Sequence, residues 1–127
     1  MTRVALVALG GAIGSVARYG VGALAAKLLG PTFPWGTLFV NLSGSFLIAL
    51  VMHVALTGTA ISLEMRIFLT TGIMGGFTTY SSFNYETLAL IDQRAYALAS
   101  LNLAATVVGC LLAGVLGLAS GRALAGA

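Results

Sequence analysis

The sequence predicts an all-α integral membrane protein of four transmembrane helices, the third of which is broken near the middle of the membrane. Of its 127 residues, 59% are hydrophobic and only 7% are charged, whereas a soluble domain carries about 25% charged residues. The apolar residues also fall into four stretches, each long enough to cross a hydrocarbon core of about 30 Å. Glycine and hydroxyl residues interrupt the third stretch, and this interruption predicts the break.

Short polar or proline-containing segments separate the four stretches. The first span is expected from about Val4 to Leu28, before a loop that contains Pro31 and Pro34. The others are expected at about Trp35–Leu56, Met65–Ile91 and Tyr96–Ala119. At this length, residues 1–127 are predicted to form a single domain.

Small residues recur at helical spacing in two of the spans. The fourth span carries one every four residues, at Ala105, Gly109, Ala113, Gly117 and Gly121. Gly10 and Gly14 repeat this spacing in the first span. Small residues let membrane helices approach closely and pack, so both rows are interpreted as packing seams rather than binding sites.

The six cations are scattered and nearly balanced across the membrane. Four spans put both termini and the loop between spans two and three on one side, with Arg3, Arg66 and Arg122; the other side carries Lys27 and Arg94. Orientation depends on the asymmetry of Lys and Arg in short loops. The near balance is compatible with insertion in both orientations and hence with an antiparallel pair; the alternative is that a weak bias fixes one orientation.

Two polar stripes line otherwise apolar spans. Thr37, Asn41 and Ser45 follow each other at spacings of four in the second span, and Asn102, Thr106 and Cys110 do so in the fourth. Residues four apart share a helix face. The stripes therefore predict either a water-lined path or hydrogen bonds between helices, and the spacing leaves both open.

The interrupted stretch, "TTGIMGGFTTYSSFN", predicts a local loss of helix at Gly75 and Gly76. Carbonyl oxygens freed there are suitable ligands for a hard cation. Tyr80 and Phe83 follow at helical spacing, and the electropositive edges of their rings can favour a small anion. The alternative is a glycine kink that serves packing, with two core aromatic residues.

The remaining polar residues do not indicate an enzyme or a nucleic-acid-binding protein. Arg18 and Glu86 fall inside the expected spans, where each could border an aqueous vestibule or pair with an opposite charge. The single cysteine excludes an intrachain disulfide. No nucleophile–base pair, phosphate loop or basic cluster is evident, so neither an enzyme nor nucleic-acid binding is expected.

Three segments together resemble the Fluc (CrcB) fluoride-channel family: "GGAIGSVARYG" (10–20), "WGTLFVNLSGSFLIA" (35–49) and "GGFTTYSSF" (75–83). The resemblance covers all four spans in the same order. It implies a multi-pass protein of the cell (inner) membrane that forms an antiparallel, dual-topology homodimer with two pores. It also implies that cytoplasmic fluoride leaves passively through these pores, which reduces its toxicity.

The resemblance also assigns residues. A structural sodium ion (Na+), not transported, would be held at the dimer interface by the backbone carbonyls of Gly75 and Thr78 from each subunit. The fluoride pore positions fall on Asn41, Tyr80, Phe83, Thr106 and Cys110. Tyr80 replaces the more usual phenylalanine, and Cys110 stands where a serine is common. Both departures put individual pore contacts in doubt, since a thiol is a weaker donor than a hydroxyl.

Two rival functions remain to be distinguished. A small multidrug-type transporter also has four spans and often dual topology, but it needs an acidic residue in the first span, and residues 4–28 contain no Asp or Glu. An accessory subunit without transport of its own is the third possibility.

Overall fold

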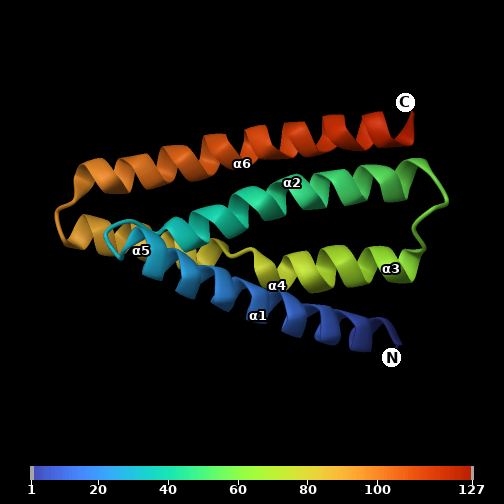
Figure 1. Cartoon of the computed structure of the whole chain (residues 1–127), viewed down its shortest axis with the longest axis horizontal. Coiled ribbons are helices and arrows are strands. Elements are labelled where there is room, and N and C mark those ends of the chain that lie inside the picture. Colours follow the sequence, from blue (N-terminus) through green and yellow to red (C-terminus); the bar gives the residue numbers. More distant parts are fainter. Residues whose placement is uncertain (1, 127) are drawn as a thin grey trace.

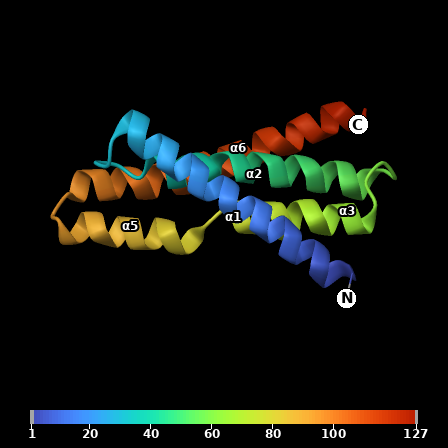
Figure 2. The same cartoon turned by 60° about the horizontal axis from the view of Figure 1, so that its bottom comes forward.

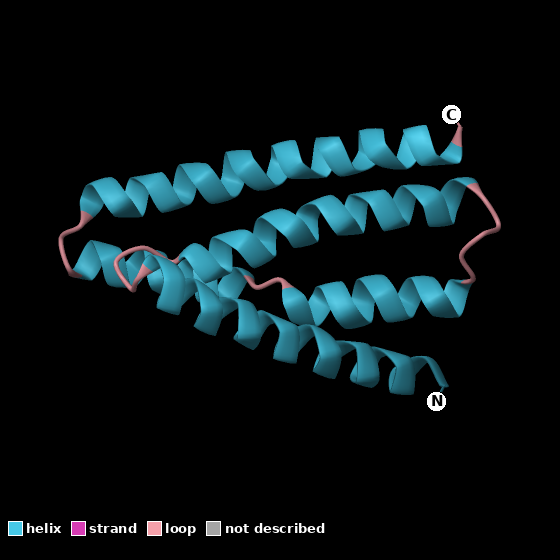
Figure 3. Ribbon diagram, viewed as in Figure 1, coloured by secondary structure: helices cyan, strands magenta, loops and turns pink. Residues whose placement is uncertain are grey.

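The computed structural model describes residues 2–126, which form helices joined by short loops (Figure 1). The elements are α1 (Thr2–Leu29), α2 (Trp35–Thr57), α3 (Leu63–Ile67), the π-helical η1 (Phe68–Met74), α4 (Gly75–Phe77), α5 (Tyr80–Asp92) and α6 (Tyr96–Ala125). By length and composition, α1, α2 and α6 can each cross a membrane. The segments α3 to α5 together make the third helix, with the loop inside it visible in Figure 3. The predicted all-α class and broken third helix are confirmed.

The chain runs back and forth along one long axis. Both ends of the chain lie beside the loop that joins α2 to α3, while the α1–α2 loop and the α5–α6 turn lie at the opposite end (Figure 1). This is the distribution of loops that four spans predict. Arg94 in the α5–α6 turn adopts a positive φ of 60°, so this turn reverses the chain within three residues between Asp92 and Tyr96.

The α2 and α6 helices pack along much of their length, and the small residues of α6 lie at this contact. A methyl group added at Gly117 would meet the backbone of Phe46, with the carbonyl carbon only 2.9 Å away. At Gly109 it would lie 2.8 Å from the side chain of Leu42. The predicted packing seam of the fourth span is therefore confirmed at these positions.

Helix α1 crosses the third helix beside the break (Figure 2). The two backbones nearly touch, because an added methyl group at Gly10 would lie 2.8 Å from the Cα of Gly72. At Gly14, an added methyl group would overlap the carbonyl of Ile73 and lie 2.8 Å from the amide nitrogen of Phe77. Gly10 and Gly14 thus form the predicted packing seam, and their partner is the third helix.

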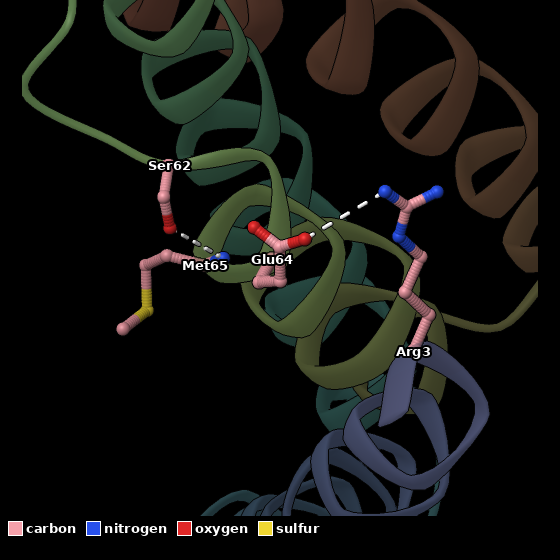
Figure 4. Close-up of polar contacts among 4 residues, drawn as sticks. All are labelled: Arg3, Ser62, Glu64 and Met65. Atoms are coloured by element: carbon pink, nitrogen blue, oxygen red, sulfur yellow. Dashed lines mark hydrogen bonds and ion pairs between the residues drawn. The ribbon is translucent and has the colours of Figure 1, made fainter. Parts of the chain in front are cut away.

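Polar contacts close the end of the molecule that carries both termini. Ser62 caps α3 by accepting a hydrogen bond from the Met65 amide at 3.1 Å, and Arg3 pairs with Glu64 at 3.6 Å (Figure 4). Both charged side chains are more than half exposed. An exposed pair of this kind contributes about 0–1 kcal/mol, so it marks the contact between α1 and α3 without dominating it.

The break does not lie at the glycine pair, and this expectation was wrong. Gly75 has helical angles of φ −60° and ψ −38°, and α4 continues through Phe77. The extended residues are Thr78 and Thr79, with ψ of 156° and 117°. Threonine adopts extended backbone readily because it is β-branched, so the break itself needs no glycine. Gly76 instead permits close packing, since an added methyl group would lie 2.5 Å from the Gly11 carbonyl oxygen.

Candidate functional site

The break in the third helix is held open by α2. The Nδ2 of Asn41 donates to the carbonyl oxygen of Thr79 at 3.0 Å, and its Oδ1 accepts from the Thr79 amide at 2.9 Å. Thr78 packs its methyl group onto Gly44. A side chain at position 44 would overlap this methyl group, so only glycine fits there. Backbone groups at membrane depth must find partners, and one buried carboxamide satisfies both groups of Thr79.

The restart of the helix is capped locally. The Thr79 hydroxyl accepts a hydrogen bond from the Ser82 amide at 3.2 Å, which makes Thr79 the N-cap of α5. Threonine is a favoured residue at this position. Thr79 is therefore fixed twice, by Asn41 from α2 and by its own hydroxyl as the cap of α5.

A groove of about 450 Å³ lies beside the break, between α2, the third helix and α6. Its lining includes all five residues that the family resemblance assigned to a pore: Asn41, Tyr80, Phe83, Thr106 and Cys110. Ser45, Thr78, Thr79, Val107 and Leu111 complete the lining. Residues far apart in the sequence thus meet along one open-sided path.

The two aromatic residues of the groove are in contact. The ring centroids of Tyr80 and Phe83 are 5.6 Å apart, with an angle of 69° between the ring planes. This edge-to-face arrangement is a favoured one for aromatic pairs. Phe83 is only 4% exposed, whereas Tyr80 is 78% exposed. Phe83 is therefore fixed within the subunit, and Tyr80 projects from its surface.

The structure divides each polar stripe between two roles. Asn41 and Ser45 line the groove, whereas the Thr37 hydroxyl donates to Glu86 at 2.6 Å. In the other stripe, Thr106 and Cys110 line the groove. Asn102 is 1% exposed and donates to the hydroxyl of Thr87 at 2.9 Å. Each stripe therefore contains both groove-lining residues and a residue that ties helices together.

Arg18 makes a contact that sequence reasoning did not anticipate. Its Nε donates to the carbonyl oxygen of Gly76 at 3.0 Å, two residues before the break begins at Thr78. Within residues 2–126, neither Arg18 nor Glu86 pairs with an opposite charge, since the ion pair found there joins Arg3 to Glu64. Spacing could not reveal the Arg18 contact because it joins residues 58 positions apart.

One of the two carbonyl groups assigned to a cation, that of Gly75, has lost its helical hydrogen bond. In a continuous helix the Thr79 amide would bond to the Gly75 carbonyl, but here that amide donates to Asn41. Gly75 lies at the exposed surface of the third helix, and only the Thr70 carbonyl oxygen, at 3.7 Å, comes near an added methyl group. The Gly75 carbonyl is thus released from the helical ladder at an exposed position.

Comparisons with known proteins agree on one family. Residues 5–118 match the family model described as "CrcB-like protein, Camphor Resistance (CrcB)". The chain belongs to the CrcB family. The match spans all four helices and every residue of the groove.

Three curated relatives illustrate the similarity, and each carries the name "Fluoride-specific ion channel FluC". The relative from Anaeromyxobacter sp. (strain K) is 58% identical over 113 residues, 89% of this chain and 90% of the relative. The relative from Agrobacterium fabrum is 49% identical over 124 residues, 98% and 99% of the two chains. A relative from Thermus thermophilus is 60% identical over 92 residues, 72% and 73% of the two chains. The family is thus one of ion channels and not of enzymes, as the sequence analysis expected.

Proposed function

We propose that this chain is the subunit of a fluoride-specific channel through which cytoplasmic fluoride leaves the cell passively. The observation that carries the proposal is that Asn41, Tyr80, Phe83, Thr106 and Cys110 line a single groove. The names of the CrcB relatives support fluoride as the ion. The four-span helical structure supports a multi-pass protein, for which the cell (inner) membrane is the proposed location.

The groove offers the donors that a small anion needs. Fluoride holds its water tightly, so a pore has to replace that water with hydrogen-bond donors. The Asn41 carboxamide has two N–H groups, of which one is used by Thr79 and one remains. The Thr106 hydroxyl and the edges of the Tyr80 and Phe83 rings are the other proposed contacts. Cys110 contributes a weaker donor one turn further along α6.

The single chain leaves the groove open on one side, which supports an antiparallel homodimer. Tyr80 projects from the surface beside the groove, and a second copy inverted in the membrane would cover this face. Nearly balanced cations at the two ends of the molecule permit both orientations. Each pore would then combine residues of both subunits.

A structural sodium ion at the centre of this dimer is also part of the proposal. Gly75 and Thr78 would each contribute a carbonyl oxygen, so that two subunits supply four. The diverted amide of Thr79 and the exposed position of Gly75 support this assignment. When bound, the ion would contribute a fixed charge that joins the two helix breaks, without moving through the membrane.

Fluoride efflux from liposomes that contain only this polypeptide tests the proposal. We expect passive efflux down a fluoride gradient, measured with a fluoride electrode, with no requirement for a proton gradient. Protein-free liposomes are the control. Efflux of a cationic drug driven by protons would support the multidrug-type alternative, which the lack of acidic residues in α1 disfavours. No transport at all would support an accessory subunit.

A further inference from the structure

Arg18 is a charged residue deep within the first transmembrane helix. It lies sixteen residues after the start of α1 and eleven before its end at Leu29, or about 16 Å from that end at 1.5 Å per residue. A charged side chain inside a membrane span is unfavourable and is usually retained for a function. Its position therefore calls for a specific role in addition to packing.

The contact of Arg18 lies at the carboxyl end of α4. The Gly76 carbonyl would bond to the amide of Tyr80 in a continuous helix, but the extended residues Thr78 and Thr79 separate the two. Arg18 supplies the missing donor through its Nε at 3.0 Å. A positive charge is favourable at this end of a helix, where the dipole is negative. Arg18 is thus a side-chain cap for the broken helix.

The neighbouring carbonyl groups of Gly75 and Gly76 therefore differ in their hydrogen bonding. Gly76 faces α1 and is bound by a guanidinium, whereas Gly75 faces the exposed side and has lost its helical donor to Asn41. The number of carbonyl oxygens around a cation is one property that sets whether sodium or potassium is preferred. A residue that removes one carbonyl from the available set can therefore influence that preference.

We propose that Arg18 restricts the cation site of the helix break to sodium by occupying the Gly76 carbonyl with its guanidinium. Arg18 is a positioning residue for the site and not a ligand. This inference rests on the sodium ion of the proposed function. Without the guanidinium, the Gly76 carbonyl would have no donor and would be available as a further oxygen ligand, which would favour the larger potassium ion.

The first test measures ion-specific stabilisation of the purified dimer. An ion that binds the folded state raises the unfolding temperature, so each protein is unfolded across a range of NaCl and KCl concentrations. For the wild type we expect stabilisation by sodium at a much lower concentration than by potassium. In Arg18→Gln, the ratio of half-maximal potassium to sodium concentrations should fall at least about fivefold, the lower end of typical coupling between sites.

A graded series and a matched control make the result specific. Lysine keeps the charge but offers a compact ammonium instead of a planar fork, so Arg18→Lys should lie between the wild type and Arg18→Gln. The series also covers a failure of Arg18→Gln to assemble, because Arg18→Lys is then compared directly with the wild type. Arg122→Gln is the control, since Arg122 is an exposed residue in the last turn of α6. Its ion preference should equal that of the wild type.

Fluoride efflux in sodium or potassium buffers is the second readout. Potassium should sustain efflux increasingly well in the order wild type, Arg18→Lys, Arg18→Gln. An unchanged ratio of the two ions in the variants that assemble overturns the role of Arg18 but leaves the sodium site standing. A wild-type dimer that responds equally to sodium and potassium overturns both the sodium site and this inference, while fluoride conduction itself is judged by efflux.

Discussion

The side chain of Asn41 forms two hydrogen bonds with the backbone of Thr79, one at 3.0 Å to the carbonyl oxygen and one at 2.9 Å from the amide. One residue of α2 thus replaces both partners that a continuous third helix would have provided. The same carboxamide lines the groove. Asn41 therefore links the stability of the break to the lining of the proposed pore.

Replacement of Asn41 should destabilise the fold as well as the pore. In Asn41→Leu, the amide and the carbonyl of Thr79 both lose their partner, and each unsatisfied buried group costs about 1–3 kcal/mol. We expect a clearly lower unfolding temperature of the protein in detergent. Ser43→Ala is the control, because Ser43 is exposed and bonds only to carbonyls of its own helix. Equal unfolding temperatures for the two variants would contradict the role of Asn41.

The break shows which part of the third helix could be predicted from the sequence. Hydroxyl and glycine residues in an apolar span indicated a break, and a break is present. Its position was assigned to Gly75 and Gly76 because glycine is the most permissive residue. The structure puts it at Thr78 and Thr79, where an extended backbone is acceptable to threonine. Gly76 instead allows close contact with the backbone of α1. The sequence of the third span alone cannot reveal this contact.

The polar stripes show a second limit of the same kind. A spacing of four residues established that Asn102, Thr106 and Cys110 share a face. It could not establish that Asn102 bonds to Thr87 while the other two line the groove. That difference depends on how α5 is aligned along α6. Contacts across long sequence separations, such as Arg18 with Gly76, were inaccessible for the same physical reason.

The close contact between α1 and the third helix predicts a sharp difference between two neighbouring glycines. In Gly14→Ala, the new methyl group would overlap the Ile73 carbonyl and press on the Phe77 amide. Backbone cannot move aside cheaply, so we expect loss of folded protein on size-exclusion chromatography. Gly11→Ala is the matched control, since nothing lies within 4 Å of a methyl group there. Similar yields of folded protein from both variants would show that the helices do not approach this closely.

Phe83 provides a test of the aromatic lining. Phe83→Ile keeps an apolar side chain at a buried position but removes the aromatic ring that lines the groove. We expect fluoride efflux from liposomes to fall at least about tenfold, equivalent to about 1.4 kcal/mol, while the dimer remains assembled.

Phe39 offers the control for that substitution. It is 47% exposed on α2 and is absent from the lining of the groove. Phe39→Ile should therefore conduct like the wild type. Unchanged efflux in Phe83→Ile would remove Phe83 from the conduction path.

Cys110 allows the path to be blocked chemically, because it is the only cysteine in the sequence. Its side chain lines the groove. A small methanethiosulfonate reagent should attach to the thiol, fill part of the groove and stop efflux, and a reducing agent should restore it. Cys110→Ser should conduct and resist the reagent. Undiminished efflux from wild-type protein whose labelling is complete by mass spectrometry would place Cys110 outside the path.

A substitution at Gly75 should affect the proposed sodium site but not the folding of the single chain. An added methyl group at Gly75 meets only the Thr70 carbonyl oxygen at 3.7 Å, so the Cβ of Gly75→Val would overlap nothing within the subunit. In the dimer, however, the branched side chain would stand beside the carbonyl that is proposed to bind sodium. We therefore expect a helical protein that has lost its stabilisation by sodium, or that no longer pairs.

Helix content is measured by circular dichroism, pairing by crosslinking, and sodium binding by the unfolding temperature in NaCl. A paired Gly75→Val protein with the sodium response of the wild type would contradict the assignment. A side chain beside a coordinating carbonyl should change the binding of the ion.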